Sequence, residues 1–184
     1  MRLFTREKLI NPLIHFFYPQ KQWIQIEYFD EVWQNRIQTM ASYIPGNAIV
    51  MDLGCGKCWL KSFLKPDHVY IPVDYLKRTD ETIVCDFNKH EFPEMKSDVI
   101  FISGCFEYVK DYKWFAKMIG LKTRMCIISY CTKDFVSYIR GRRKLAWVNH
   151  LSEKELTNLF KENNFKLMHT DYSIKNNVIF IFQS

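Results

Sequence analysis

Short, nearly continuous runs of apolar residues recur along the chain, and three of them end in an aspartate. Five runs lie within residues 48–52, 69–74, 82–86, 98–109 and 124–132. Such runs are typical of parallel strands that are buried on both faces. Two further strand-like segments, 165–173 and 177–183, meet across Lys175 and Asn176, which predicts an antiparallel hairpin. The pattern predicts an α/β fold with seven strands, mostly parallel, closed by a C-terminal antiparallel hairpin.

Helical spacing of apolar residues appears before and between these runs. It is found in residues 21–43, at Trp23, Ile26, Phe29, Trp33, Ile37 and Met40. This predicts an amphipathic helix that ends at Pro45-Gly46 and covers one face of the sheet. Ser152 and Glu155 have the spacing of a capping box and predict a helix over 153–163. A further helix is predicted over 110–119, whereas residues 133–149 show no clean period.

Two connections are too short for the helices that usually join parallel strands. Only residues 75–81 separate the second and third runs, and residues 87–97 contain a proline. A parallel crossover usually needs a dozen or more residues. We therefore expect trimmed helices around strands two to four.

A glycine turn follows the first apolar run, in the stretch AIVMDLGCGKCW at residues 48–59. Gly54 and Gly56 allow a tight turn and a close approach of the backbone to a ligand. A helix is predicted to start near Lys57 and to point its free N–H groups at that ligand. Trp59 stands where a dinucleotide fingerprint has its third glycine, and no Gly-Lys-Ser/Thr follows, so neither NAD nor a nucleotide phosphate is indicated.

This turn resembles the first motif of the class I S-adenosylmethionine-dependent methyltransferases. The resemblance extends over residues 44–132, through the segments VYIPVD, TIVCD, DVIFISGCFEYV and RMCIISYCT. It implies a Rossmann-like, doubly wound sheet and S-adenosyl-L-methionine as cofactor. The resemblance places the cofactor on Asp52, Gly54, Cys55, Gly56, Asp74, Asp86, Ser103 and Gly104. Asp74 is expected to accept the ribose hydroxyls, Asp86 either meets the adenine amino group or caps a turn, and the N-terminal helix either packs or also covers the cofactor.

Candidate catalytic and acceptor-binding residues lie after the fourth and fifth runs. His150 is the best candidate base, because histidine titrates near neutral pH, although a histidine hydrogen-bonded near a helix start is an equal alternative. Glu107 either receives a proton or orients the substrate, or it stabilises a helix N-terminus. The substrate-binding candidates are Tyr108, Arg140, Arg142, Arg143 and Asn149. The basic cluster 140–144 suits a phosphate, or else is a solvated loop.

The cysteines predict no metal site. Cys55 and Cys58 form a C-x-x-C pair, which can be redox-active or metal-binding, but no second such pair exists for zinc. Small buried thiols are the simpler interpretation. Six cysteines without a recognisable export signal predict a reducing, cytoplasmic location.

Composition adds further limits. The chain has 184 residues, a net charge of +6 and 48% hydrophobic residues, which suits one compact unit. We predict an N-terminal helical cap at 1–44 and a methyltransferase domain at 45–184. No apolar run is long enough to span a membrane. The first eighteen residues, aromatic and basic, are a candidate oligomer contact.

The predicted function is methyl transfer to a small-molecule or glycan acceptor, with O-methylation of a sugar or sugar-phosphate preferred. That preference comes from a resemblance of YIPVDY, IVCDFNK, SGCFEYV and NHLS to compact methyltransferases of bacterial surface-polysaccharide gene clusters. Methylation of base amines is disfavoured because Ser103-Gly-Cys-Phe106 stands where such enzymes have Asn/Asp-Pro-Pro-Tyr/Phe. Two alternatives stay open: a non-catalytic cofactor-binding partner protein, and an RNA methyltransferase that uses the 140–144 loop.

Overall fold

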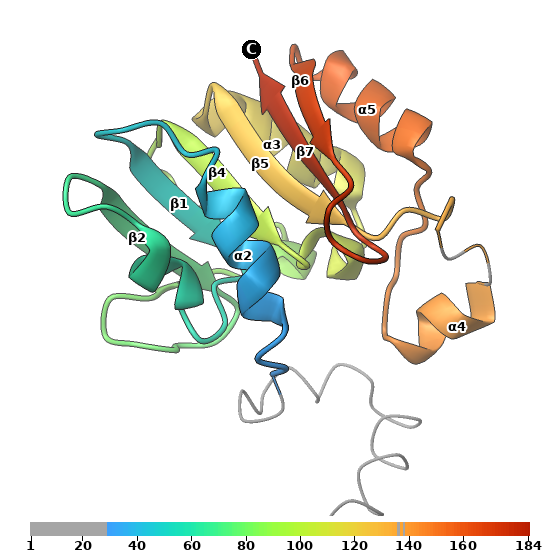
Figure 1. The fold of residues 1–184 in the computed structure, drawn as a ribbon, viewed down its shortest axis with the longest axis horizontal. Coiled ribbons are helices and arrows are strands. Elements are labelled where there is room, and N and C mark those ends of the chain that lie inside the picture. The colour runs from blue at the N-terminus through green and yellow to red at the C-terminus, as the bar shows by residue number, and fades with distance from the viewer. Residues whose placement is uncertain (1–28, 136, 138) are drawn as a thin grey trace, which may run out of the picture.

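A computed structural model describes residues 29–135, 137 and 139–184, and these form one sheet with helices on both faces (Figure 1). The strands are β1 (Ile49–Leu53), β2 (Val69–Asp74), β3 (Ile83–Val84), β4 (Val99–Ser103), β5 (Met125–Tyr130), β6 (Lys166–Asp171) and β7 (Val178–Gln183). Their order across the sheet is β3-β2-β1-β4-β5-β7-β6. The first five are parallel, and β7 pairs antiparallel with both β5 and β6. The predicted seven-stranded mixed sheet with its C-terminal hairpin is confirmed.

The helices lie on opposite faces of this sheet. They are α2 (Trp33–Ala41), α3 (Tyr112–Lys122), α4 (Ile139–Lys144) and α5 (Glu153–Glu162). In the view of Figure 1, α2 crosses in front of the strands while α3 and α5 lie behind them. Short 3-10 helices occur at η3 (Trp59–Phe63), η4 (Phe87–Lys89) and η5 (Phe106–Tyr108).

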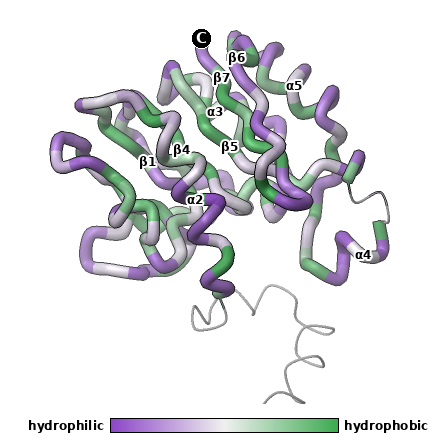
Figure 2. Tube along the Cα trace, in the orientation of Figure 1, coloured by the Kyte–Doolittle hydropathy of each residue, from purple (hydrophilic) through white to green (hydrophobic). Residues whose placement is uncertain are grey.

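Each face of the sheet has its own hydrophobic core. Side chains alternate along β1, so that Met51 and Leu53 face α3 and α5, whereas Val50 faces α2. The α3–α5 side is rich in phenylalanine, and Phe160 stacks on Phe182 with 4.3 Å between ring centroids. The central strands are correspondingly the most hydrophobic part of the trace (Figure 2).

Helix starts follow the local sequence signals. Ser152 and Glu155 form the predicted capping box, in which each side chain bonds the other residue's backbone N–H, and α5 begins at Glu153. The Asp111 side chain accepts the backbone N–H of Trp114 and caps α3, which begins two residues after the predicted start.

Two helix predictions were wrong or incomplete. The helix expected near Lys57 is only the 3-10 helix η3, because Cys58 adopts a left-handed conformation with φ of 54° just before it. No helix was predicted at α4, which is only six residues long. The predicted helix over 21–43 is represented by α2, and residues 21–28 of that prediction lie outside the described part of the chain.

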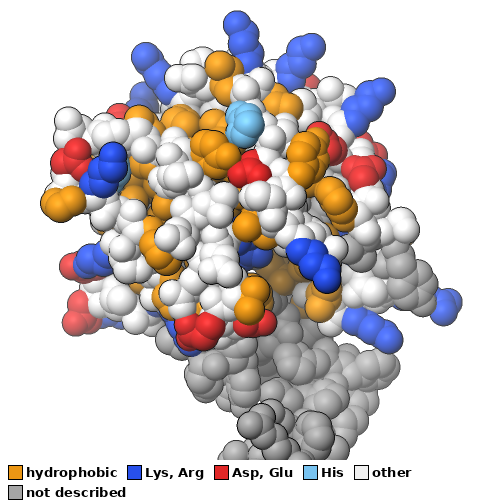
Figure 3. Space-filling model, in the orientation of Figure 1, with side chains coloured by type: hydrophobic (Ala, Val, Ile, Leu, Met, Phe, Trp, Pro, Cys, Tyr) orange, Lys and Arg blue, Asp and Glu red, His pale blue; other side chains and the backbone are white. Residues whose placement is uncertain are grey.

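The expected trimming of the connections is present. Residues 75–82, between β2 and β3, contain no helix, and η4 is the only helical turn between β3 and β4 in this fully described stretch. Within residues 29–135, 137 and 139–184, no helix is long and apolar enough to cross a membrane. On the face shown in Figure 3, Lys and Arg side chains stand out along the outline, and hydrophobic side chains are interspersed among polar ones.

Candidate active site

The carboxyl ends of β1, β2, β4 and β5 meet at one edge of the sheet. The strand order changes direction between β1 and β4, because β1 leads to β2 on one side while β4 leads to β5 on the other. Ligands of open α/β sheets bind at such a switch point, outside the carboxyl ends of the strands. The predicted glycine turn follows β1 at this place.

Two glycines of that turn require conformations that other residues rarely adopt. Gly54 has φ of 82° and Gly56 has φ of 51°. The Gly54 N–H donates to the Val73 carbonyl at 2.8 Å, which fixes the turn to β2. A Cβ on Gly54 would stand 2.6 Å from the Cys105 Sγ atom, and one on Gly56 would collide with the Phe29 ring. The turn is therefore closely packed by side chains from two other segments.

Asp74, at the end of β2, is buried and organises this corner. Its Oδ2 accepts the Gly56 N–H at 3.0 Å, and its Oδ1 accepts the Leu76 N–H at 3.1 Å. The Arg78 Nε atom lies 3.2 Å from the same Oδ1, and both side chains of this ion pair are about 5% exposed. The predicted ribose-binding carboxylate is thus present at the strand tip, with one edge bound to the glycine turn.

Another glycine with a left-handed backbone conformation, Gly104, lies directly after β4. Gly104 has φ of 64°, and a Cβ there would stand 2.8 Å from an Arg36 guanidinium nitrogen. Arg36 comes from α2 and donates from Nε to the Ser103 Oγ at 3.0 Å. Burial lowers the pKa of Arg36, and the nearby Glu107 carboxylate opposes this effect. Helix α2 therefore places a cation over the β4 turn.

The two other carboxylates that were predicted to bind the cofactor, Asp52 and Asp86, have hydrogen-bond partners within the protein. The Asp52 carboxylate is buried and accepts the Tyr70 hydroxyl at 2.9 Å, and burial raises its pKa to about 8 despite this bond. Asp86 accepts the Asn88 N–H at 3.0 Å and begins η4. Asp86 thus caps a turn, and its contact with the adenine amino group stays a prediction.

Glu107 is buried in η5, shortly after β4, with 2% of its surface exposed. Its Oε1 accepts the Cys131 N–H at 2.9 Å, and its main-chain carbonyl accepts the Val148 N–H at 2.8 Å. Among the residues that the structure describes, no hydrogen-bond partner reaches its Oε2 atom. Burial raises the pKa of Glu107, while the bond from Cys131 and the guanidinium of Arg36 lower it. This carboxylate is therefore a buried group that retains an acceptor atom.

His150, the predicted base, has one ring nitrogen bonded to a neighbouring arginine. Its Nδ1 accepts from the Arg142 Nε atom at 3.1 Å. Since an arginine can only donate, the proton of a neutral His150 ring lies on Nε2, which is then a donor. Burial and the charges of Arg142 and Arg143 lower the pKa of His150. With Nδ1 bonded in this way, His150 is a hydrogen-bond donor, and its role as a base stays a prediction.

Arg142 is fully buried and so differs from the other arginines of the predicted basic cluster. It donates to the Cys131 carbonyl and stacks on the Trp147 ring with 4.7 Å to the ring centroid. Because it is 0% exposed, Arg142 is not open to a phosphate in solvent, although phosphate binding was one predicted role of the basic cluster. Arg140 and Arg143, in contrast, are exposed on α4. Arg142 thus anchors α4 to the end of β5 and leaves the other two arginines facing solvent.

Asn149 and Tyr108, also predicted to bind substrate, are engaged within the protein. The Asn149 amide donates to the Phe106 and Val109 carbonyls and accepts from the Tyr130 hydroxyl at 2.6 Å. The Tyr108 hydroxyl accepts from the Trp147 indole N–H at 3.0 Å. Asn149, which is 3% exposed, therefore holds the segment after α4 against β5.

Three residues that contact the turns were not predicted as site residues. They are Phe29, Arg36 and Arg78. Phe29 lies against Gly56, and the Arg78 guanidinium carbon lies 6.0 Å from its ring centroid. A signal for Arg78 existed, because it follows Asp74 by four residues in a connection too short for a helix. No local signal identified Arg36, whose position became informative only when α2 was placed over β4.

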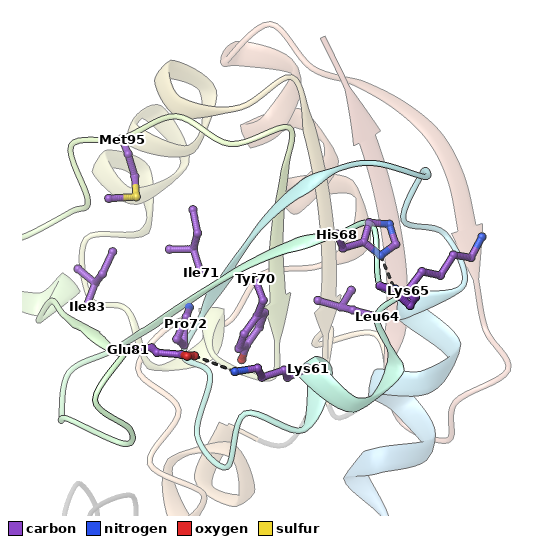
Figure 4. A pocket seen from close by; sticks show the side chains of 11 residues that line it. Lys61, Leu64, Lys65, His68, Tyr70, Ile71, Pro72, Glu81, Ile83 and Met95 are labelled. Atoms are coloured by element: carbon purple, nitrogen blue, oxygen red, sulfur yellow. Dashed lines mark hydrogen bonds and ion pairs between the residues drawn. The ribbon is translucent and has the colours of Figure 1, made fainter.

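A separate hollow lies beside β2, away from the carboxyl edge (Figure 4). Its volume is about 590 Å³, and Tyr70, His68 and Lys61 are among its lining residues. None of the residues predicted to bind cofactor lines it. Among the residues that the structure describes, no group of three or more His, Cys, Asp or Glu side chains could hold a metal ion.

The described residues fit an adenosyl cofactor at the carboxyl edge. Gly54, Gly56 and Gly104 leave the backbone free of Cβ atoms there, and Asp74 supplies a buried carboxylate. The groups that lie against Gly56 and Gly104 are side chains of Phe29 and Arg36, not backbone. This combination defines a nucleotide-type binding turn with a class I methyltransferase strand order.

Comparison with known proteins gives the family. Residues 25–170 match the family described as a methyltransferase domain, and the chain belongs to this family. It is an S-adenosylmethionine-dependent methyltransferase of class I, and S-adenosyl-L-methionine is its cofactor. A search of the curated proteins found no match for this chain.

Solved structures share the fold at low sequence identity. One is the Burkholderia thailandensis 1,6-didemethyltoxoflavin N1-methyltransferase with bound 1,6-didemethyltoxoflavin and S-adenosylhomocysteine, with 16% identity, a TM-score of 0.69 and coverage of 100% of this chain and 92% of that chain. A second is the Synechocystis magnesium protoporphyrin IX methyltransferase with bound S-adenosylhomocysteine, with 13% identity, a TM-score of 0.68 and coverage of 96% and 99%. A third is a possible histamine N-methyltransferase of Thermotoga maritima, with 14% identity, a TM-score of 0.66 and coverage of 94% and 98%.

Proposed function

We propose that this methyltransferase acts on a hydroxyl group of a small-molecule or glycan acceptor, with a sugar phosphate as the preferred class. S-adenosylmethionine supplies an electrophilic methyl group when it is bound. The observation that carries the proposal is the pair of exposed arginines, Arg140 and Arg143, on a helix that Arg142 fixes to the end of β5. Guanidinium groups bind phosphate oxygens in a bidentate manner, so this edge suits an anionic acceptor.

Cofactor binding is assigned to the ends of β1, β2 and β4. In this proposal, the turn at Gly54–Gly56 receives the methionine part and Asp74 accepts the ribose hydroxyls. The Oδ2 of Asp74 accepts one main-chain N–H, which leaves this atom a free lone pair. Phe29 and Arg36 must move from Gly56 and Gly104 if the cofactor lies directly on these glycines. In this proposal Phe29 and helix α2 cover the site, and the N-terminal cap at 1–44 stays a prediction.

Proton removal from the acceptor is assigned to Glu107 rather than to His150. The Oε2 atom of Glu107 is buried, and no other residue in the described part of the chain bonds it. Burial raises the pKa of Glu107, which makes the carboxylate a stronger base. His150 lacks an acceptor atom once Nδ1 is bonded to Arg142. In this assignment His150 and Asn149 position the loop that borders the acceptor.

The proposal is tested by a panel of acceptors. Purified protein is incubated with S-adenosylmethionine and either neutral sugars, sugar phosphates, nucleotide sugars, small N-nucleophiles or a short RNA, and S-adenosylhomocysteine is quantified by mass spectrometry. We expect turnover with a phosphorylated sugar and none with RNA. Turnover confined to RNA or to amines would refute the proposed acceptor class without affecting the family assignment.

The role of the exposed arginines is tested on the best acceptor. We expect the double substitution Arg140→Ala/Arg143→Ala to raise KM for a phosphorylated acceptor about tenfold and to leave kcat nearly unchanged. Lys117→Ala, which removes an exposed cation from α3 instead of α4, is the matched control. Equal effects of the two variants would refute a specific phosphate contact. Glu107→Gln should lower kcat by about 100-fold or more and leave the KM for S-adenosylmethionine unchanged.

A further inference from the structure

The glycine turn holds two cysteines in contact. Cys55 lies between Gly54 and Gly56, and Cys58 follows the turn at the start of η3. Their Sγ atoms are 3.7 Å apart, within hydrogen-bonding distance for sulfur, and both are free thiols. Methyl transfer as assigned above makes no use of Cys58.

We propose that Cys55 and Cys58 form a reversible thiol–disulfide site that is oxidised by low-molecular-weight disulfides such as oxidised glutathione. A disulfide requires a sulfur–sulfur separation of about 2.05 Å, so the sulfurs need to approach by roughly 1.6 Å. The backbone that must adjust is the turn itself, which is tied to β2 by bonds from the Gly54 and Cys55 N–H groups to the Val73 carbonyl and from the Gly56 N–H to Asp74.

Cys58 is the attacking thiol. It is partly exposed, whereas Cys55 is buried, so an external disulfide reaches Cys58 first. When Cys58 loses its proton, the Cys55 S–H donates to the thiolate, and this bond lowers the pKa of Cys58. Tyr70 on β2 and Lys61 on η3 act in the same direction. Burial and the carboxylate of Asp74 oppose them.

The reaction balances with one disulfide consumed. The Cys58 thiolate attacks a sulfur of the external disulfide, forms a mixed disulfide and releases one thiolate. Cys55 then gives its proton to solvent and attacks the Cys58 Sγ atom, which forms the internal disulfide and releases the second thiolate. Two electrons pass from the protein sulfurs to the external disulfide, which becomes two thiols.

Oxidation should weaken cofactor binding, and this consequence rests on the proposed placement of the cofactor. Pulling Cys55 towards Cys58 displaces the N–H of Gly56 relative to the Asp74 carboxylate. Asp74 then leaves the position in which it accepts the ribose hydroxyls, and loss of one charged hydrogen bond to the ribose corresponds to about a tenfold decrease in affinity. Redox state would then control whether the enzyme holds its methyl donor.

The disulfide can be mapped directly, because Lys57 lies between the two cysteines. Trypsin cleaves after Lys57 and separates residues 37–57 from residues 58–61, so an internal disulfide joins two peptides. Wild-type protein is equilibrated in oxidised and reduced glutathione at several ratios, the remaining thiols are alkylated, and the digest is analysed by mass spectrometry. Cys126, which is 0% exposed in β5, is the internal control and should be recovered reduced.

We expect the linked peptide pair to appear in oxidised glutathione and to disappear after dithiothreitol. Cys58→Ser should abolish it. Absence of the pair at every glutathione ratio, or a linkage of Cys55 to a different cysteine, would overturn the proposal. Calorimetric titration of S-adenosylhomocysteine into both forms tests the consequence: the reduced protein should bind about tenfold more tightly than the oxidised one. If the disulfide forms and neither form binds, the cofactor placement fails and the thiol site stands.

Discussion

Replacing Asp74 by Asn tests the electrostatic organisation of the cofactor corner. The substitution keeps the shape of the side chain but removes the charge that faces Arg78 at 3.2 Å. It also replaces one of the two acceptor oxygens that bind the Gly56 and Leu76 N–H groups by an amide that can only donate. Both side chains of the ion pair are about 5% exposed, so solvent cannot compensate for the loss.

The expected cost follows from this burial. Removing one partner of a buried ion pair destabilises a protein by about 3 kcal/mol. With a urea m-value of about 2 kcal/mol/M for a chain of this size, the unfolding midpoint should fall by about 1.5 M. Affinity for S-adenosylhomocysteine should fall by about 10- to 100-fold, because charged hydrogen bonds to two ribose hydroxyls are weakened.

Two measurements separate these effects. Urea unfolding is followed without cofactor, and the affinity is measured by calorimetry at low temperature, where both proteins remain folded. Asp98→Asn is the matched control, because Asp98 accepts the Ile49 N–H at 2.8 Å at the amino end of β1, far along the strand from the glycine turn. Unchanged cofactor affinity in Asp74→Asn, or an equal loss in Asp98→Asn, would refute the assignment of Asp74.

Three further predictions concern the turn, the histidine and the helix cap. Gly56→Ala should lower the free energy of unfolding, measured in urea, by more than the strain of about 1–2 kcal/mol for a left-handed residue, because the new Cβ meets the Phe29 ring. In a Phe29→Ala background only the strain should remain, and equal losses in both backgrounds would contradict this packing. Burial and Arg142 lower the pKa of His150, so the unfolded chain binds the extra proton first, and the free energy of unfolding should fall as the pH drops below about 6.5. His150→Gln should flatten this dependence between pH 7.5 and 5.5, and parallel curves for the two proteins would disprove it. Ser152→Ala should cost about 1 kcal/mol in thermal or urea unfolding through loss of the capping bond, and no change would show that the cap does not limit stability.

The sheet was predictable from sequence because its strands are buried on both faces. Each central strand is a continuous apolar run, and the acidic residues at 52 and 74 mark the carboxyl ends of β1 and β2. The capping box was equally readable, since its two residues interact within one turn. Signals of this kind are local, and local signals survive without knowledge of the tertiary structure.

The acceptor side was less predictable because its chemistry depends on distant contacts. Arg142 looks like any member of a basic run, yet it is buried by the Cys131 carbonyl and the Trp147 ring. The sequence around His150 gives no sign that its Nδ1 atom bonds Arg142, eight residues earlier. The prediction of a helix near Lys57 was wrong for a related reason, because the spacing of apolar residues does not reveal the left-handed conformation of Cys58.

The position of β7 between β5 and β6 has a consequence for how the chain folds. Strand β5 can pair on one side with β4 as soon as both exist, but its other side must wait for Val178–Gln183, about fifty residues later. Until then an apolar strand edge is exposed, and such edges readily pair with other molecules. A polypeptide cut before Val178 would leave that edge open permanently and β6 without a neighbour, so we expect it to aggregate during expression rather than to accumulate as a smaller folded protein.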